Sequence, residues 1–464
     1  MLEQNVAQEV LAQAVRTGGS FAEIFLEDRT NHLLQIRSGK VDTVNSLRMH
    51  GAGVRVFTGT NAIYVYTNDT SREGLLSCAR KAADAVRGQA ACTPVPLVQV
   101  ETPSVHPVII HPDNAKTALK IAKLRQAEKA ARKDARIVQV IAGYNDSCQR
   151  VWIANTEGLF TGDTRVYARL ILTAVASSGS ENQTGNESPG AMMGFEIFDQ
   201  RIDPDGVGRT AADIALTNLE ADVCPAGVMP VVIDNGFGGV IFHEACGHSL
   251  EATSVAFGAS EFCGKIGQRV AADCVTAVDD GTMPNEWGSL NIDDEGMPTG
   301  RLTLIENGIL RNYMIDKLGG LRMNMPATGS SRRESYAFAP TSRMRNTYIA
   351  AGTDSEEEMI RTMGDGLYAK RMGGGSVNPA TGEFNFAVME GYLVKDGKIV
   401  RPVRGASLIG RGSEVLTRID RVGGDMRMSQ GMCGSQSGSV PTNVGQPRIR
   451  VSGLTVGGKA EREG

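Results

Sequence analysis

The amino-acid sequence predicts an α+β protein, with an N-terminal α/β part followed by a β-rich, barrel-like antiparallel part that carries one helix. Three observations support this class. Helical and strand-like apolar patterns alternate over roughly the first half of the chain, and strand patterns dominate after it. The 55 glycines crowd the C-terminal half, which is typical of many turns. The proline- and glycine-containing stretch 224–230 marks the expected boundary between a domain at 1–224 and a second at 225–464.

In the first domain, apolar residues with helical spacing predict helices over 3–17, 71–86 and 113–136, and Ser71 is a plausible N-cap for the second. Alternating apolar and polar residues predict an antiparallel sheet. Its expected strands are 21–27, 32–36, 53–57 and 62–66, followed by 137–144, 150–155 and 165–177, with a last helix over 208–221. The lysines of 113–136 are interrupted by acidic residues and lack interleaved aromatic residues, so we interpret them as a solvated face.

The second domain begins with a short buried strand at 231–234, a glycine-rich turn at 235–239 and a helix over 240–253. Two dipeptides, Asn307-Gly308 and Asp396-Gly397, lie between strand-like segments. Such pairs adopt the positive φ angles of two-residue hairpin turns, so both predict β-hairpins.

Composition excludes several classes of function. The net charge is −4, so the protein as a whole lacks the positive charge that is typical of nucleic-acid binding. No apolar run approaches 18 residues, and the N-terminus has neither the basic nor the apolar region of an export signal. The eight cysteines form no CxxC pairs and are expected to be reduced thiols. We therefore expect a soluble cytoplasmic protein that binds neither nucleic acid nor membrane.

The most informative motif is His243-Glu244 followed by His248, which uses two of only six histidines. In zinc proteases, two histidines four residues apart lie on one helix face and the intervening Glu acts as general base. Here the step is five residues, which on a regular helix turns the second side chain by about 140° relative to the first. One metal ion would then not reach both rings. The motif therefore predicts a π-type bulge near Gly247.

A third metal ligand has several candidates. Glu251 lies three residues after His248, on the same helix face, and Cys433 lies in a loop flanked by glycines. Cys246 is inside the motif and is better interpreted as a small buried residue. The acidic clusters 279–280 and 293–295 precede glycines, as turn residues do. The residues alone rank Cys433 and Glu251 equally.

Residues 231–458 resemble the TldD branch of the TldD/PmbA family of metallopeptidases. The N-terminal half resembles that family more loosely. The matching stretches are 243–251, 278–282, 292–296, 304–310, 329–337, 343–348, 373–375, 405–410, 433–434 and 444–458. The resemblance implies one zinc ion per chain held by His243, His248 and Cys433, with Glu244 as the base. PmbA-type relatives lack this set, whereas this chain keeps all four residues.

The resemblance also implies a hydrolase that cleaves unfolded peptides or peptide precursors, as a homodimer or beside a PmbA/TldE-like chain. The glycine-rich stretches 373–375 and 431–438 are suited to present bare backbone to an extended peptide. The alternative is a non-catalytic regulatory protein of the family, as its older description as gyrase modulators suggests; an amidase acting on small molecules is a third hypothesis. Glu251 is expected to orient an imidazole. Arg332, Arg333 and Tyr336 are expected either to stabilise the tetrahedral intermediate or to hold a loop in place.

Overall fold

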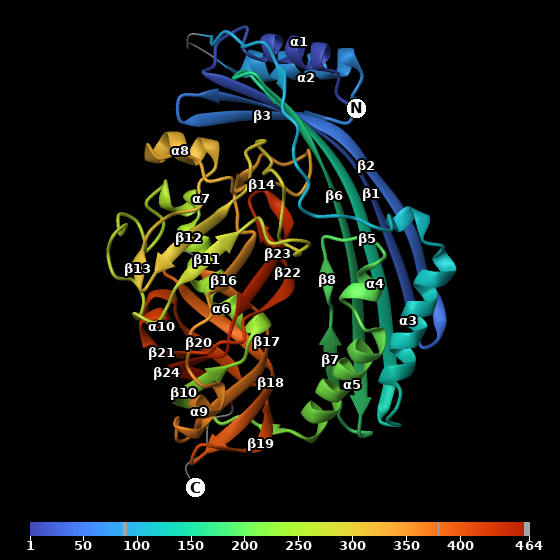
Figure 1. Ribbon diagram of the computed structural model, residues 1–464, viewed down its shortest axis with the longest axis vertical. Coiled ribbons are helices and arrows are strands. Elements are labelled where there is room, and N and C mark those ends of the chain that lie inside the picture. Colours follow the sequence, from blue (N-terminus) through green and yellow to red (C-terminus); the bar gives the residue numbers. More distant parts are fainter. Residues whose placement is uncertain (87–90, 379, 459–464) are drawn as a thin grey trace.

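The computed structural model describes residues 1–86, 91–378 and 380–458. Its N-terminal half is built on one sheet of long antiparallel strands in the order β3-β2-β1-β5-β6, and the shorter β4, β7 and β8 each pair with β6 (Figure 1). The strands are β1 (Phe21–Arg37), β2 (Lys40–Thr58), β3 (Asn61–Thr67), β4 (Val98–Gln99), β5 (Ile137–Asn155), β6 (Leu159–Ser177), β7 (Asn182–Glu187) and β8 (Gly190–Ala191).

Two helix pairs pack on this sheet and give it two separate apolar cores. Helices α1 (Gln4–Ala14) and α2 (Arg72–Ala85) cover one end, and α3 (Thr117–Ala131) and α5 (Pro204–Glu220) cover the other (Figure 1). The side chain of Ser71 caps α2 by accepting a hydrogen bond from the Gly74 amide, as predicted. A short α4 (Ile197–Gln200) and a 3₁₀ turn (Pro112–Asn114) complete the helices of this half.

The expected antiparallel sheet is present, but its strands are longer than predicted. Predicted strands 21–27 and 32–36 are one strand, β1, and 137–144 and 150–155 are likewise one strand, β5. The helix predicted over 113–136 is shorter, and one of its lysines is not solvated. Lys120 is 5% exposed, and its Nζ lies 2.6 Å from Asp146 on the neighbouring strand.

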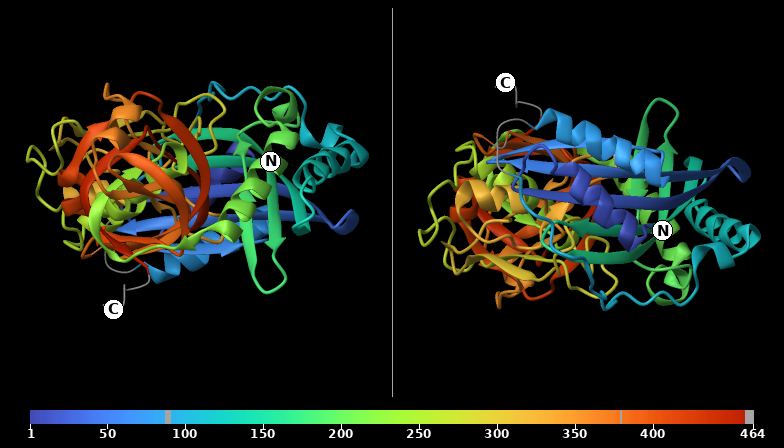
Figure 2. Two further views of the ribbon diagram at one scale, coloured as in Figure 1. Left: turned by 90° about the horizontal axis from the view of Figure 1, so that it is seen from below. Right: turned by 90° about the horizontal axis from the view of Figure 1, so that it is seen from above.

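The C-terminal half contains a closed five-stranded barrel in the order β17-β10-β24-β20-β18, with β18 pairing back to β17 (Figure 2). All neighbouring pairs are antiparallel except β10 with β17. The barrel strands are β10 (Gly227–Ile233), β17 (Gly366–Asn378), β18 (Glu383–Lys395), β20 (Ser407–Arg411) and β24 (Ile449–Gly457), and β9 (Asp222–Val223), β19 (Lys398–Arg404) and β21 (Ile419–Val422) extend the same sheet. The predicted β-rich, barrel-like part is therefore present.

A second sheet in this half has the order β13-β12-β11-β16-β23-β22, which leaves β22 at its edge. Its strands are β11 (Ala277–Asp280), β12 (Arg301–Glu306), β13 (Ile309–Leu310), β16 (Asn346–Ile349), β22 (Arg427–Ser435) and β23 (Gly438–Gln446), and β14 (Ser331–Arg332) pairs with β15 (Thr341–Ser342) beside it. The short helices α7 (Ala252–Val255) and α8 (Lys317–Met323) contact β15, whereas α9 (Glu356–Arg361) and α10 (Gly412–Arg418) contact strands of the barrel sheet. Both predicted hairpin turns are confirmed, with positive φ at Asn307 and Asp396.

Buried ion pairs join the two halves. Arg165 on β6 lies 2.7 Å from Asp294, and Arg333 lies 3.0 Å from Glu23 on β1. Because all four side chains are buried, these pairs fix the first sheet against the loops of the C-terminal half. No helix in the described part of the chain is both long and apolar enough to cross a membrane.

Candidate metal centre

The motif segment is a broken helix whose central turn is wider than an α-turn. It consists of α6 (Val240–Phe242), a π-turn (His243–Gly247), a 3₁₀ turn (His248–Leu250) and then α7. The amide of His248 donates to the carbonyl oxygen of His243, five residues earlier, which is the hydrogen bond that defines a π-turn. The predicted bulge is confirmed. It places both histidines on one face, with their ring centroids 5.3 Å apart.

Cys433 on edge strand β22 completes a compact group with these histidines. Its Sγ lies 3.2 Å from Nε2 of His243 and 3.2 Å from Nε2 of His248. The three ligand-type atoms all lie within 4.8 Å of one another, and all three residues are buried. Among the described residues, this is the one group of three or more such side chains close enough to hold a metal ion.

The geometry and chemistry of this group fit zinc. Histidine nitrogen and cysteine thiolate are common zinc ligands, and catalytic zinc sites have three protein ligands and keep a fourth position free. Donors that share one tetrahedral zinc are separated by roughly 3.5 Å, given zinc–ligand distances of about 2.0–2.3 Å. The observed separations of 3.2 Å are close to this value. Zinc at this position would therefore require little movement of the side chains.

The pKa values of Cys433 and His248 are shifted by the charged groups around them. Burial would raise the pKa of the Cys433 thiol, but the adjacent His243 and His248 outweigh burial and hold that pKa well below its usual value. Burial would likewise lower the pKa of His248, yet Glu251 and Cys433 hold it well above the ordinary histidine value. The lowered pKa favours the thiolate form of Cys433, which is the form that binds metals.

Further residues hold this group in place. Glu251 is 2% exposed, and its Oε2 lies 3.1 Å from Nδ1 of His248, the ring nitrogen that faces away from Cys433. A carboxylate at that nitrogen fixes the orientation and tautomer of a metal-binding imidazole. The guanidinium of Arg343 donates to the carbonyl oxygen of Cys433, and its Nε lies 4.0 Å from Glu251. Arg343 thus links the edge strand to the histidine turn.

Glu244 differs from the rest of the group because its side chain reaches solvent. It is 26% exposed, whereas the side chain of His248 is 11% exposed. The Oε2 atom of Glu244 lies 3.7 Å from Nε2 of His248, the nitrogen that faces Cys433. This carboxylate therefore lies beside the histidines at the accessible side of the group, where a water molecule can reach it.

The other candidate ligands lie apart from the centre. Cys246 is buried, as expected, and its thiol is outside the group. The acidic clusters serve the fold: Asp279 pairs with Arg345 at 2.7 Å, and Asp293 accepts hydrogen bonds from backbone amides, including that of Ser331. Arg333 and Tyr336 hold their loop against the first sheet, through Glu23 and through Glu27, whose Oε2 accepts the Tyr336 amide.

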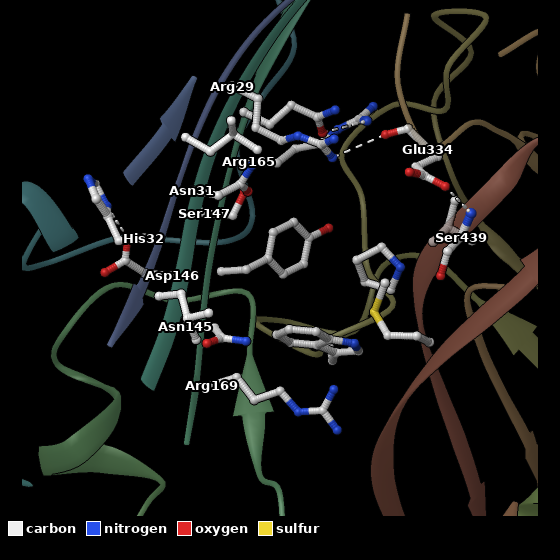
Figure 3. Close-up of a pocket in the computed structure, with 18 of the residues that line it drawn as sticks. Arg29, Asn31, His32, Asn145, Asp146, Ser147, Arg165, Arg169, Glu334 and Ser439 are labelled. Atoms are coloured by element: carbon white, nitrogen blue, oxygen red, sulfur yellow. Dashed lines mark hydrogen bonds and ion pairs between the residues drawn. The ribbon is translucent and has the colours of Figure 1, made fainter. Parts of the chain in front are cut away.

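Two cavities lie along β22. The first, of about 550 Å³, lies between the first sheet and the β22–β23 hairpin, and its lining includes Met432 and Arg332 (Figure 3). The second, of about 620 Å³, is lined by Gln430 and Gly431, and also by Gly373 and Gly374 of β17. Arg169 lines both. The lining residues run consecutively along β22, so the two cavities adjoin neighbouring parts of the strand that carries Cys433. Arg343 opens the matching stretch 343–348, although the sequence assigned it no role, and no sequence pattern pointed to Arg169.

The chain is similar to known proteins along most of its length. Residues 22–86, 110–219 and 226–458 match domain 1, the central domain and the C-terminal domain of the PmbA/TldA metallopeptidases. The "Metalloprotease TldD homolog" of Buchnera aphidicola is 35% identical over 94% of this chain and 92% of its own. The "Zinc metalloprotease TldD homolog" of Saccharolobus solfataricus is 30% identical over 62% of this chain and 64% of its own. The structure of TldE from Thermococcus kodakarensis superimposes with a TM-score of 0.78 at 17% identity, covering 98% of this chain and 99% of that one.

Proposed function

Since this chain belongs to the PmbA/TldD family of metallopeptidases, we propose that it is a zinc-dependent peptidase that cleaves unfolded peptides or peptide precursors. In this proposal, His243, His248 and Cys433 hold one zinc ion, and Glu244 is the general base. The observation that carries the proposal is the convergence of two imidazole nitrogens and one thiolate beside a solvent-accessible carboxylate. That combination is what metal-assisted hydrolysis requires.

The proposed mechanism assigns a task to each side chain. When bound, zinc supplies a Lewis acid that polarises the scissile carbonyl and makes water more acidic. Glu244 accepts a proton from the attacking water and delivers it to the leaving amine. Glu251 accepts the proton on Nδ1 of His248 and so fixes the ring with Nε2 directed at the metal position. The negative charge of Cys433 partly neutralises a divalent ion, so we expect slower turnover than at an all-histidine site.

The cavities along β22 support the proposed substrate class. Gly373, Gly374 and Gly431 line the same cavity, and strand β22 has a partner on one side only. Glycine-rich edge strands leave backbone groups accessible to an extended peptide, which binds by adding a strand with little side-chain preference. Folded proteins have few free extended segments. We therefore propose that unfolded peptides are the substrates and that folded proteins are spared.

Two finer points belong to the same proposal. The likeness to TldE supports an assembly in which this chain works beside a PmbA/TldE-like chain or as a homodimer. All eight cysteines are free, which supports a reducing, cytoplasmic location.

The test is hydrolysis of unfolded peptides, followed by mass spectrometry of the products. We expect the zinc-loaded protein to cleave such peptides, and Glu244→Gln to keep the zinc but to lose a factor of roughly 10²–10⁴ in rate, because proton transfer is lost. Near-normal activity in that variant would exclude Glu244 as the base. Zinc-loaded protein that cleaves no peptide in a broad panel would instead favour a non-catalytic regulatory role.

A further inference from the structure

Two arginines in the first cavity have no acidic partner. Arg332 is 3% exposed, and its Nη1 donates to the carbonyl oxygen of Met344 at 2.8 Å. Arg169 donates from Nε and Nη2 to the carbonyl and hydroxyl oxygens of Ser188, both at 2.9 Å. Within the described part of the chain, neither guanidinium lies within 4.0 Å of a carboxylate. Arg165 and Arg333, which line the same cavity, are both paired with buried carboxylates.

The protonation behaviour of these arginines reflects the same difference. Burial lowers the pKa of Arg332 to about 10 and also lowers that of Arg169. The pKa of Arg165 is raised instead, because Asp294 and Asp163 outweigh its burial. A buried cation without an opposite charge is costly for a folded protein. Arg332 and Arg169 therefore leave positive charge uncompensated in this cavity.

The cavity's acidic residues are engaged elsewhere. Asp146 is held by Lys120, Asp294 by Arg165, and the Glu334 carboxylate by the Ser439 amide at 2.7 Å. Glu334 lies on the β23 side of the cavity and Arg169 on the opposite wall (Figure 3).

An aromatic wall adjoins the two arginines. The rings of Tyr167 and Trp287 pack edge to face with centroids 5.2 Å apart, and the Arg169 guanidinium lies 5.3 Å from the Trp287 ring. Met432 continues the apolar surface and is the residue directly before Cys433 on β22. The cavity therefore reaches the strand that carries Cys433, at the residue next to it.

We propose that this cavity binds a carboxylate of the substrate peptide through Arg332 and Arg169. The inference rests on the proposed peptidase function and adds a preference for acidic substrates to it. Guanidinium groups recognise carboxylates by paired, charge-assisted hydrogen bonds. The carboxylate has two sources, the C-terminus of the peptide or an Asp or Glu side chain, and the aromatic wall would pack against the adjoining apolar atoms.

Matched peptides separate the two sources. One pair differs only in a free or an amidated C-terminus, and a second, amidated series differs in Glu or Gln at each position in turn. We expect kcat/KM to be roughly tenfold or more higher for the acidic member of at least one pair, as a charge-assisted hydrogen bond provides. A terminal preference identifies the C-terminus as the ligand, and a positional preference identifies a side chain. Equal rates throughout would overturn the inference and leave the peptidase function intact.

Variants assign the preference to these arginines. We expect Arg332→Gln and Arg169→Gln each to reduce the ratio of acidic to neutral kcat/KM, and Arg332→Lys to restore part of it. Arg125→Gln, an exposed residue of α3, makes the same change of charge and should keep the wild-type ratio. A ratio that is unchanged in both cavity variants would overturn the assignment.

A binding measurement covers the case in which no peptide is cleaved, which would count against the peptidase function. Trp287 is one of only two tryptophans, so the zinc-loaded Trp152→Phe, Glu244→Gln protein reports on the cavity by fluorescence. Tighter binding of an acidic peptide than of its neutral match, lost with Arg169→Gln, would support the cavity assignment by itself. Equal binding of both peptides would overturn it.

Discussion

The sulfur atom of Met344 lies only 2.1 Å from the position that a Cβ atom on Gly247 would occupy. Met344 is fully buried, and Arg332 donates to its carbonyl oxygen. The π-turn can therefore approach β16 and its flanking loop only because residue 247 has no side chain. The wide turn that places His243 beside His248 depends on this contact.

Gly247→Ala tests this dependence. We expect the added methyl group to cost about 1–3 kcal/mol in the free energy of unfolding, as overpacking of a core does, and to weaken zinc binding by moving His248. Denaturant unfolding and zinc titration measure the two effects. In a Met344→Ala background the penalty should shrink, because the methyl group then has space. An equal penalty in both backgrounds would show that the contact does not limit the turn.

Removal of one ligand should abolish zinc binding. We expect about one zinc per chain in the wild-type protein and almost none in Cys433→Ser or His248→Ala, because a zinc site of this type needs all three protein donors. Elemental analysis by mass spectrometry gives the stoichiometry. Cys274→Ser changes an exposed cysteine remote from the centre and should retain the metal. Full occupancy in Cys433→Ser would refute the proposed ligand set.

Glu251→Gln should weaken the centre without removing a ligand. An amide holds the Nδ1 proton of His248 less strongly than a carboxylate, and loss of such a partner typically costs 10–100-fold in metal affinity or activity. Zinc competition with a chromogenic chelator measures the affinity. Glu261→Gln provides the control, because Glu261 is close to Glu251 in the sequence but lies outside the metal group. An unchanged zinc affinity in Glu251→Gln would show that the Glu251 side chain contributes to packing and not to zinc binding.

Zinc affinity should rise with pH through the neutral range. The pKa of His248 is raised in the metal-free protein, so zinc must displace a proton from this imidazole. The pKa of Cys433 is lowered, so its thiol has already lost its proton. We therefore expect release of about one proton per zinc from this pair near pH 7. Calorimetry in buffers of different ionisation enthalpy counts the protons, and release of two would contradict the thiolate state of Cys433.

The sequence predicted the local parts of the site better than the distant ones. The five-residue spacing of His243 and His248 requires a bulge, and the π-turn provides it. Cys433 and Glu251 were equal candidates from the residues alone. The reason is that the neighbourhood of Cys433 depends on how β22 packs, 190 residues along the chain from His243. Arg332 was singled out in the sequence but Arg169 was not, and only the packing of β6 against the C-terminal half brings the two to one cavity.

In the fold, too, local features were predicted better than those that depend on distant residues. Helix α2 was predicted with its Ser71 cap, because capping is a local property. The long strands were predicted in pieces, since the polar residues in the middle of β1 interrupt the alternation while their backbone still pairs with β2 and β5. Lys120 was assigned to solvent because Asp146, its partner, belongs to another element.

The position of Cys433 also sets when the centre can form during synthesis. Translation must add 185 residues after His248, and β22 must then pair with β23, before the thiolate reaches the imidazoles. A growing chain on the ribosome therefore carries the two histidines as an incomplete site. Other nascent polypeptides are unfolded and are of the type that this protein is proposed to cleave. They would be exposed to the proposed hydrolytic centre only after this protein has itself folded.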